Sequence, residues 1–118
     1  MNSLKVAKYL YDEFLENNGQ SSTIEFFRRS PHAYLTMLLI FCFQKQKKEL
    51  SISDIYKNIP VNVASQLTIH NLINDAVDAN FLIKEQMPND SRSLKITFTE
   101  ESLKSIEKWL DNVYKSIS

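Results

Sequence analysis

The stretch MPNDSRSLKITFT, Met87–Thr99, decides the fold, because it has the pattern of a β-hairpin with an enlarged tip. Turn-forming residues crowd its first part, and Leu94–Phe98 then alternates apolar and polar residues like a half-buried strand. The preceding segment, Phe81–Gln86, predicts the first strand of the hairpin. Arg92 lies at the predicted tip and is the only arginine in the second half of the chain. These residues predict a projecting hairpin that carries a positive charge.

Amphipathic helical patterns lie on both sides of the hairpin. Ala64–Asn80 precedes it and Glu100–Ile117 follows it, and each places apolar residues on one helical face. Ser3–Asn17 has a third such face, with Gly19 as the predicted stop. The stripe of Ser3–Asn17 comprises Leu4, Ala7, Leu10, Tyr11, Phe14 and Leu15. The core-facing stripe of Ala64–Asn80 comprises Ile69, Leu72, Ile73, Ala76 and Val77. The stripe of Glu100–Ile117 comprises Leu103, Ile106, Leu110, Val113, Tyr114 and Ile117, flanked by Trp109.

Serine and proline signals predict where three further helices begin. Ser22 or Thr23 is expected to cap a short helix through Arg28. Ser30 is expected to cap a helix over Pro31–Gln46, with proline in the first helical position. Ser53 is expected to cap a helix over Asp54–Ile59, after a very short strand at Leu50-Ser51-Ile52.

The helix Pro31–Gln46 is apolar almost all round, which predicts the central buried element of the fold. Its Cys42 is therefore expected to be a buried and inert thiol, since a reactive thiol needs exposure and positive neighbours. Lys45, Lys47 and Lys48 are expected to end this helix in water, where cations suit a helix C-terminus.

The bulk properties predict one domain in the cytoplasm. A chain of 118 residues fits one hydrophobic core. Its single cysteine excludes an intrachain disulfide and suits a reducing compartment. The longest apolar run, Met37–Phe43, is too short to cross a bilayer, and Met1–Asn18 lacks the pattern of a signal peptide. We therefore expect no contact with a membrane.

The sequence offers little to a catalytic interpretation. Neither His32 nor His70 has cysteine or carboxylate neighbours at metal-ligand spacing. A chain with one glycine cannot build a glycine-rich phosphate loop. We expect a protein that is not an enzyme and that binds no metal or other cofactor.

The charge balance limits how the chain can attract nucleic acid. Lys plus Arg number 14 and Asp plus Glu number 14, so the formal net charge is zero. Because DNA affinity comes largely from cationic contacts to phosphates, a DNA-binding face would have to be local. The candidate cations are Arg28, Arg29, Lys45, Lys47, Lys48, Lys84, Arg92 and Lys95.

The segments Asp54–Ile59 and Ala64–Asn80, joined by a break at Pro60-Val61-Asn62, predict a helix-turn-helix. If the stripe of the second helix faces the core, its outer face presents residues whose amide and methyl groups suit contact with adenine and with thymine methyl. The alternative is a merely solvated polar face. The outer-face residues are Ala64, Leu67, Thr68, Asn71, Asn74 and Asp75, with Gln66 and His70 at the margins.

The run Asp90–Glu101 resembles the wing of the MarR (multiple antibiotic resistance regulator) family, in which an Asp-x-Arg-Ser/Ala tip precedes two apolar residues, Thr and the C-terminal helix. Leu50–Ile55 is similar to the short strand and first helix of that family's helix-turn-helix. Ser65–Ile83 resembles its recognition helix and following strand. The resemblance covers Leu50 to about Leu110, although Phe81 and Ser102 stand where the family usually has glycine.

The resemblance implies a homodimeric transcription regulator that binds double-stranded DNA, with recognition helices in major grooves and wing arginines in minor grooves. It places the recognition helix at 64–80 and the wing at 87–95. A small-molecule effector site between the dimerisation helices and the DNA-binding core follows from the family analogy alone. The implied DNA-binding residues are Ser65, Gln66, Thr68, His70, Asn71, Asn74, Arg92, Ser93 and Lys95.

The expected fold is therefore mainly α with a small β-hairpin wing, an α+β winged helix-turn-helix. Residues 1–48 would form N-terminal helices for the core and for dimerisation, 49–99 the winged helix-turn-helix, and 100–118 a C-terminal dimerisation helix. The competing hypothesis is a winged helix that binds other proteins and has no DNA function. Arg92 favours DNA, whereas the neutral charge and the acidic Asp75 and Asp78 of the recognition helix favour the competitor.

Overall fold

The computed structural model of the chain describes residues 3–17 and 21–117, without the side chains of residues 17 and 90–92. Over this part, six helices and one two-stranded antiparallel hairpin follow each other along the chain. The predicted Gly19 stop lies outside the described residues. The elements are α1 (Ser3–Asn17), α2 (Ser22–Phe27), α3 (Pro31–Lys45), α4 (Ile52–Asn58), α5 (Gln66–Asp78), β1 (Leu82–Met87), β2 (Asp90–Phe98) and α6 (Glu100–Ile117).

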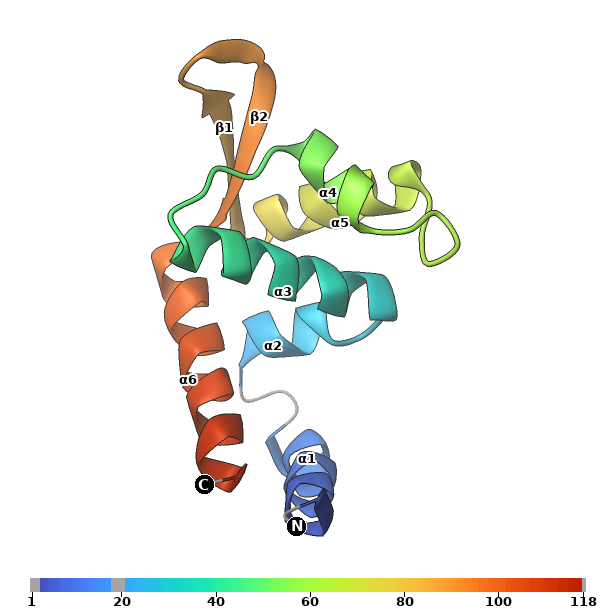
Figure 1. Cartoon of the computed structure of the whole chain (residues 1–118), viewed down its shortest axis with the longest axis vertical. Coiled ribbons are helices and arrows are strands. Elements are labelled where there is room, and N and C mark those ends of the chain that lie inside the picture. Colours follow the sequence, from blue (N-terminus) through green and yellow to red (C-terminus); the bar gives the residue numbers. More distant parts are fainter. Residues whose placement is uncertain (1–2, 18–20, 118) are drawn as a thin grey trace.

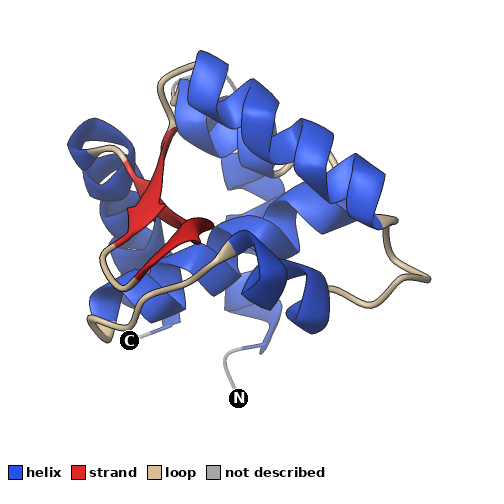
Figure 2. Ribbon diagram, turned by 90° about the horizontal axis from the view of Figure 1, so that it is seen from above, coloured by secondary structure: helices blue, strands red, loops and turns tan. Residues whose placement is uncertain are grey.

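The molecule is elongated, with extents of 48 × 29 × 27 Å. The hairpin projects at one end, with α4 and α5 beside it, and α1 lies at the opposite end next to the last turns of α6 (Figure 1). Seen from above, the two strands lie to one side of a group of helices (Figure 2). α6 contacts α1, α2 and β2, so it runs from the base of the hairpin to the far end.

The core forms where α2, α3, α5, α6 and the hairpin meet. The stripe predicted for α5 packs there: Ile69, Leu72, Ile73 and Ala76 are buried and Val77 is half-buried. Phe27 is fully buried, and its ring lies 5.7 Å from that of Phe98 in an edge-to-face arrangement. The predicted winged helix-turn-helix with a small hairpin is confirmed.

Several predicted helix boundaries move by one or two residues. α4 is capped by Ser51 and not by Ser53: Ser51 Oγ accepts from the Asp54 amide at 3.1 Å, and Asp54 accepts from the Ser51 amide at 3.0 Å. This reciprocal capping box uses Ser51, which was predicted to lie in a short strand. Of that strand, an isolated bridge from Ser51 to Lys95 remains. Leu50 is buried just before it.

α2 is capped by Ser21, whose side chain accepts from the amide of Ile24, and not by Ser22 or Thr23. Thr23 is buried instead, with its hydroxyl 3.1 Å from that of Ser102 on α6. A hydrogen bond between two buried hydroxyls satisfies both groups. Ser102 therefore links α6 to α2. Glycine is usual at this position in the family that the sequence resembles.

The joint between α5 and the hairpin explains why α5 and β1 differ from their predicted ranges. α5 ends at Asp78, and Asn80 takes a left-handed conformation with φ 65°. The amide of Phe81 then donates to the carbonyl of Ala76 at 2.8 Å, which closes a Schellman-type helix end. Phe81 is therefore used in ending the helix, and β1 begins at Leu82.

α3 is not buried all round, which corrects the predicted central element. Ser30 caps it as expected, and Ala33, Thr36, Met37 and Ile40 are buried. Other side chains of the helix face outward: Leu35 is 39% exposed and Cys42 is exposed. The expectation of a buried Cys42 is therefore wrong. Lys45, Lys47 and Lys48 end the helix in water, as predicted.

Candidate nucleic-acid interface

The first half of α5 carries the reading face, the outward side with Gln66, His70 and Asn71 exposed, and the second half of the helix contacts β1 of the hairpin (Figure 1). Ser65 is its N-cap, with Oγ accepting from the Thr68 amide at 3.1 Å. Ser65 Oγ also lies 3.0 Å from Thr68 Oγ1, so these two predicted readers already pair with each other. Gln66, His70 and Asn71 are exposed, whereas Thr68 is half-buried.

Leu67 and Val61 place apolar surface next to these polar groups. Leu67 is 68% exposed in the first turn of α5, and Val61 is 79% exposed in the turn that precedes it. Leu67 lies on the predicted outer face but is not among the predicted site residues.

Asn74, also predicted to contact DNA bases, uses its side-chain amide in hydrogen bonds within the protein. Its Oδ1 accepts from Lys84 Nζ at 2.9 Å, and its Nδ2 lies 3.0 Å from His70 Nε2. Lys84 is on β1, so this chain of hydrogen bonds joins the hairpin to the exposed face of α5. Asn74 is half-buried and both ends of its amide are occupied.

The hairpin has the enlarged tip that its sequence predicts. Cross-strand pairing is regular from the pair Leu82 and Phe98 to the pair Gln86 and Leu94. It then shifts, so that Met87 pairs with Asp90 and β2 has three extra residues, between Asp90 and Leu94, relative to β1. Arg92 is one of these three, at the predicted tip, and its side chain lies outside the described part. Ser93 is half-buried, and Lys95 Nζ lies 3.9 Å from Glu85 Oε1 across the two strands.

The cations expected to attract DNA are unequally available. Arg28 is not available to contact DNA, because its guanidinium is buried and pairs with the carboxylate of Glu13 at 2.6 Å. Lys84 is engaged by Asn74, and Lys45 pairs with Glu107 at 3.3 Å in a solvent-exposed position. Arg29 stacks over the ring of Phe26 at 4.3 Å and lines a hollow of about 230 Å³ with Thr68 and Asn71 of α5. Arg29 is therefore a cation close to the reading face.

At the opposite end of the molecule, α1 exposes apolar side chains and buries a carboxylate. On α1, Leu4, Tyr11 and Leu15 are exposed by 80%, 68% and 63%, so the predicted stripe faces outward. Glu13 is buried instead and accepts from Arg28 and from Trp109 Nε1, the latter at 3.2 Å. Burial and the Glu13 charge raise the pKa of Tyr9.

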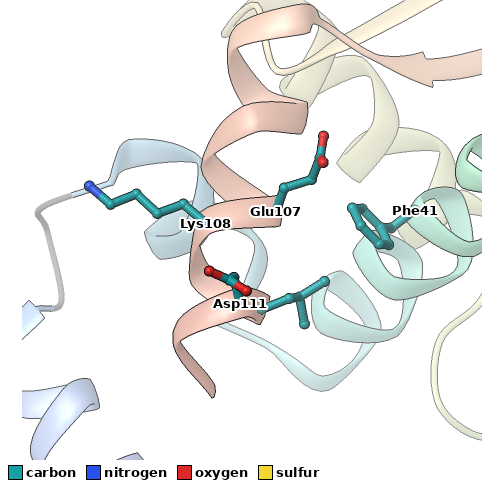
Figure 3. A pocket seen from close by; sticks show the side chains of 5 residues that line it. Phe41, Glu107, Lys108 and Asp111 are labelled. Carbon is teal, nitrogen blue, oxygen red and sulfur yellow. The ribbon is translucent and has the colours of Figure 1, made fainter. Parts of the chain in front are cut away.

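Two hollows border α6 near this end. One, of about 620 Å³, is lined by Phe41 of α3 and by α6 residues Glu107, Lys108, Leu110 and Asp111, and Figure 3 shows the Phe41 ring opposite Glu107. The other, of about 370 Å³, lies among α1, α2 and α6, with Glu13 and Trp109 in its wall.

Within residues 3–17 and 21–117, no three His, Cys, Asp or Glu side chains are placed to hold a metal ion. No helix in those ranges has the length and apolarity needed to traverse a bilayer.

No protein-family model matches the sequence, and no curated protein matches it. Solved structures do share its fold. Over 93% of its length the chain is similar to a mutant MepR from a multidrug-resistant clinical isolate of S. aureus, with TM-score 0.62 and 17% identity over 74% of that chain. The heme sensor PefR of Streptococcus agalactiae has TM-score 0.54 and 17% identity, over 98% of this chain and 78% of that one.

The adhesin competence repressor AdcR of Streptococcus pyogenes is similar over 98% of this chain and 76% of that one, with TM-score 0.54 and 13% identity. MepR, PefR and AdcR are all regulators of the MarR family. The fold defined by the hairpin and the helix-turn-helix is thus a winged helix. In particular, it is the winged-helix fold of MarR-family regulators.

Proposed function

We propose that the chain is a homodimeric transcription regulator that binds double-stranded DNA, with α5 in the major groove and the hairpin tip in the minor groove. The observation that carries the proposal is the exposed first half of α5, in a helix whose second half contacts the projecting hairpin. Gln66, His70 and Asn71 are exposed there, in the turns that reach base edges in a docked recognition helix. Amide side chains suit the donor and acceptor pair on adenine.

The hairpin tip supplies the second proposed contact. Arg92, which Ser93 and Lys95 follow along β2, would enter the minor groove, where an arginine meets the most negative potential. With no Lys or Arg on α5, the hairpin and Arg29 would carry a large share of the attraction to phosphates. Binding should therefore be weak at high salt and should depend strongly on a few cations.

The dimer interface is proposed at the far end, where α1 and α6 expose apolar side chains. Tyr114 and Ile117 at the end of α6 are 67% and 42% exposed, next to the outward stripe of α1. A surface of this kind is stabilised when a second copy covers it about a two-fold axis. A two-fold dimer would carry two recognition helices and two hairpins.

Fluorescence anisotropy with labelled, sheared genomic DNA at two salt concentrations tests the proposal. We expect binding at low salt that weakens as salt rises, and a loss on Arg92→Ala without a change in the unfolding transition. Lys8→Ala is the matched control, because it removes one exposed cation at the α1 end and should lower affinity far less. Equal affinity of wild type and Arg92→Ala would reject the wing contact.

The second candidate function is a winged helix that binds a protein. The exposed Val61 and Leu67, together with the absence of Lys and Arg on α5, favour it. Failure to bind DNA at low salt, or binding that salt does not weaken, would contradict the DNA-binding proposal and favour this alternative.

A further inference from the structure

The hydrogen-bond chain from Lys84 through Asn74 to His70 has only one consistent arrangement of donors and acceptors. A lysine ammonium only donates, so the Asn74 atom that faces Lys84 Nζ at 2.9 Å must be the carbonyl oxygen Oδ1. The other end of the amide, Nδ2, is then a donor, and it faces His70 Nε2 at 3.0 Å. Because Nδ2 donates, Nε2 must accept, and a ring nitrogen that accepts carries no proton.

We propose that Lys84 and Asn74 act as positioning residues that fix the ring proton of His70 on Nδ1, and that His70 thereby reads guanine in the major groove as a hydrogen-bond donor. The proposal rests on the proposed DNA-binding function and assigns a chemical role to one residue of that face. His70 is exposed, and within the described part of the chain its Nδ1 makes no hydrogen bond. That nitrogen is available as a donor to a ligand.

The donor character of Nδ1 selects among the groups that DNA presents. In the major groove guanine offers two adjacent acceptors, N7 and O6, whereas adenine sets a donor beside its acceptor and thymine sets a methyl group beside its own. A lone donor is therefore best satisfied by guanine. His70 lies one turn after Gln66 in the first half of α5, where residues of a docked recognition helix meet base edges.

Nuclear magnetic resonance of the free protein tests the positioning step without DNA. Two-bond nitrogen–proton correlations of the imidazole rings identify which nitrogen carries the proton, and the His32→Asn variant assigns the two histidines. We expect the Nδ1–H pattern for His70 in the wild type. An Nε2–H pattern would overturn the proposal.

Two variants separate positioning from simple packing. Asn74→Asp keeps the shape but makes both oxygens acceptors, so His70 must then donate through Nε2 and its pattern should change. Lys84→Arg keeps the donor to Asn74 and should preserve the Nδ1–H pattern, whereas Lys84→Met should lose it. If all three variants give the wild-type pattern, Lys84 and Asn74 do not position the ring.

Selection of binding sites from a pool of randomised DNA duplexes tests the guanine contact. We expect His70→Ala to lose a guanine preference at one position of each half-site and to bind the wild-type site roughly 3- to 10-fold more weakly, the scale of one hydrogen bond. An equal loss on every sequence would mean a phosphate contact and would overturn the reading of guanine. If the wild type selects no DNA, the DNA-binding function fails and the guanine contact with it, whereas the fixed proton on Nδ1 is judged by the resonance experiment alone.

Discussion

α1 and α5 are both amphipathic helices of similar length, yet they face the rest of the protein with opposite sides. α5 buries Ile69 and Ile73 and turns its polar side chains outward. α1 buries Glu13 and exposes Leu4, Tyr11 and Leu15. The same periodic pattern thus covers a core in one helix and is left uncovered in the other. The difference teaches that an apolar stripe indicates the need for a partner surface but does not say which molecule supplies it.

Removing the carboxylate of Glu13 should have the largest effect on stability, because it holds α1 by the polar side. Glu13→Ala leaves the buried guanidinium of Arg28 without this ion pair and removes the acceptor for Trp109 Nε1. Loss of one member of a buried pair costs about 3–5 kcal/mol. Urea unfolding measures the loss, with Lys8→Ala on the exposed side of α1 as the control. A loss below about 1 kcal/mol would mean that the pair is solvated.

Truncating the buried stripe of α5 should have the next largest effect. Ile73 is fully buried, so Ile73→Ala leaves a cavity and should lower the free energy of unfolding by about 2–5 kcal/mol. Leu67→Ala, on the exposed side of the same helix, should change it by no more than about 0.5 kcal/mol. Similar losses in the two variants, measured by the same urea transition, would break the contrast between the faces.

A charge in the exposed stripe of α1 should act on assembly and leave the fold intact. Tyr11→Asp places a carboxylate where we propose that a second copy packs, so the variant should be a monomer at micromolar concentration where the wild type is a dimer. Light scattering measures the mass. Val61→Asp is the matched control, because Val61 is 79% exposed at the other end of the molecule and its change should leave the dimer intact. A monomeric wild type would exclude this interface.

Removing the N-cap of α5 should have the smallest effect of the four. Ser65→Ala loses the hydrogen bond to the Thr68 amide and should cost about 1 kcal/mol. Ser53→Ala provides the comparison, since Ser53 is exposed in α4, which is capped by Ser51. Thermal unfolding should rank Ser65→Ala below Ser53→Ala. The reverse order would mean that the cap geometry does not carry this stability.

The features predicted correctly from the sequence are those encoded locally. The stripe of α5, the Ser30-Pro31 start of α3 and the turn-rich tip of the hairpin each depend on neighbours a few residues away. The Ser51 cap was also signalled by the Ser-x-x-Asp spacing to Asp54, but the short-strand interpretation of Leu50–Ile52 obscured it.

The features that were missed depend on contacts between distant parts of the chain. Which side of α1 faces inward is decided by Arg28 and Trp109, and the latter lies 96 residues from Glu13. The engagement of Asn74 depends on Lys84 of the hairpin, and the exposure of Cys42 depends on which elements pack against α3. No local pattern in the sequence contains this information, because periodicity describes a helix and not its neighbours.

The joint at Asn80 and Phe81 has a mechanical consequence. Those two residues alone stand between the cap of α5 and the first residue of β1, and both are tied down. Phe81 donates to Ala76 and accepts from Thr99, while the hydroxyl of Thr99 donates to the carbonyl of Asn80. These hydrogen bonds therefore hold α5 and the hairpin at one fixed distance and orientation relative to each other. If the proposed contacts with both grooves are made, the span between them is fixed by the protein, and the DNA has to supply the groove width that fits it.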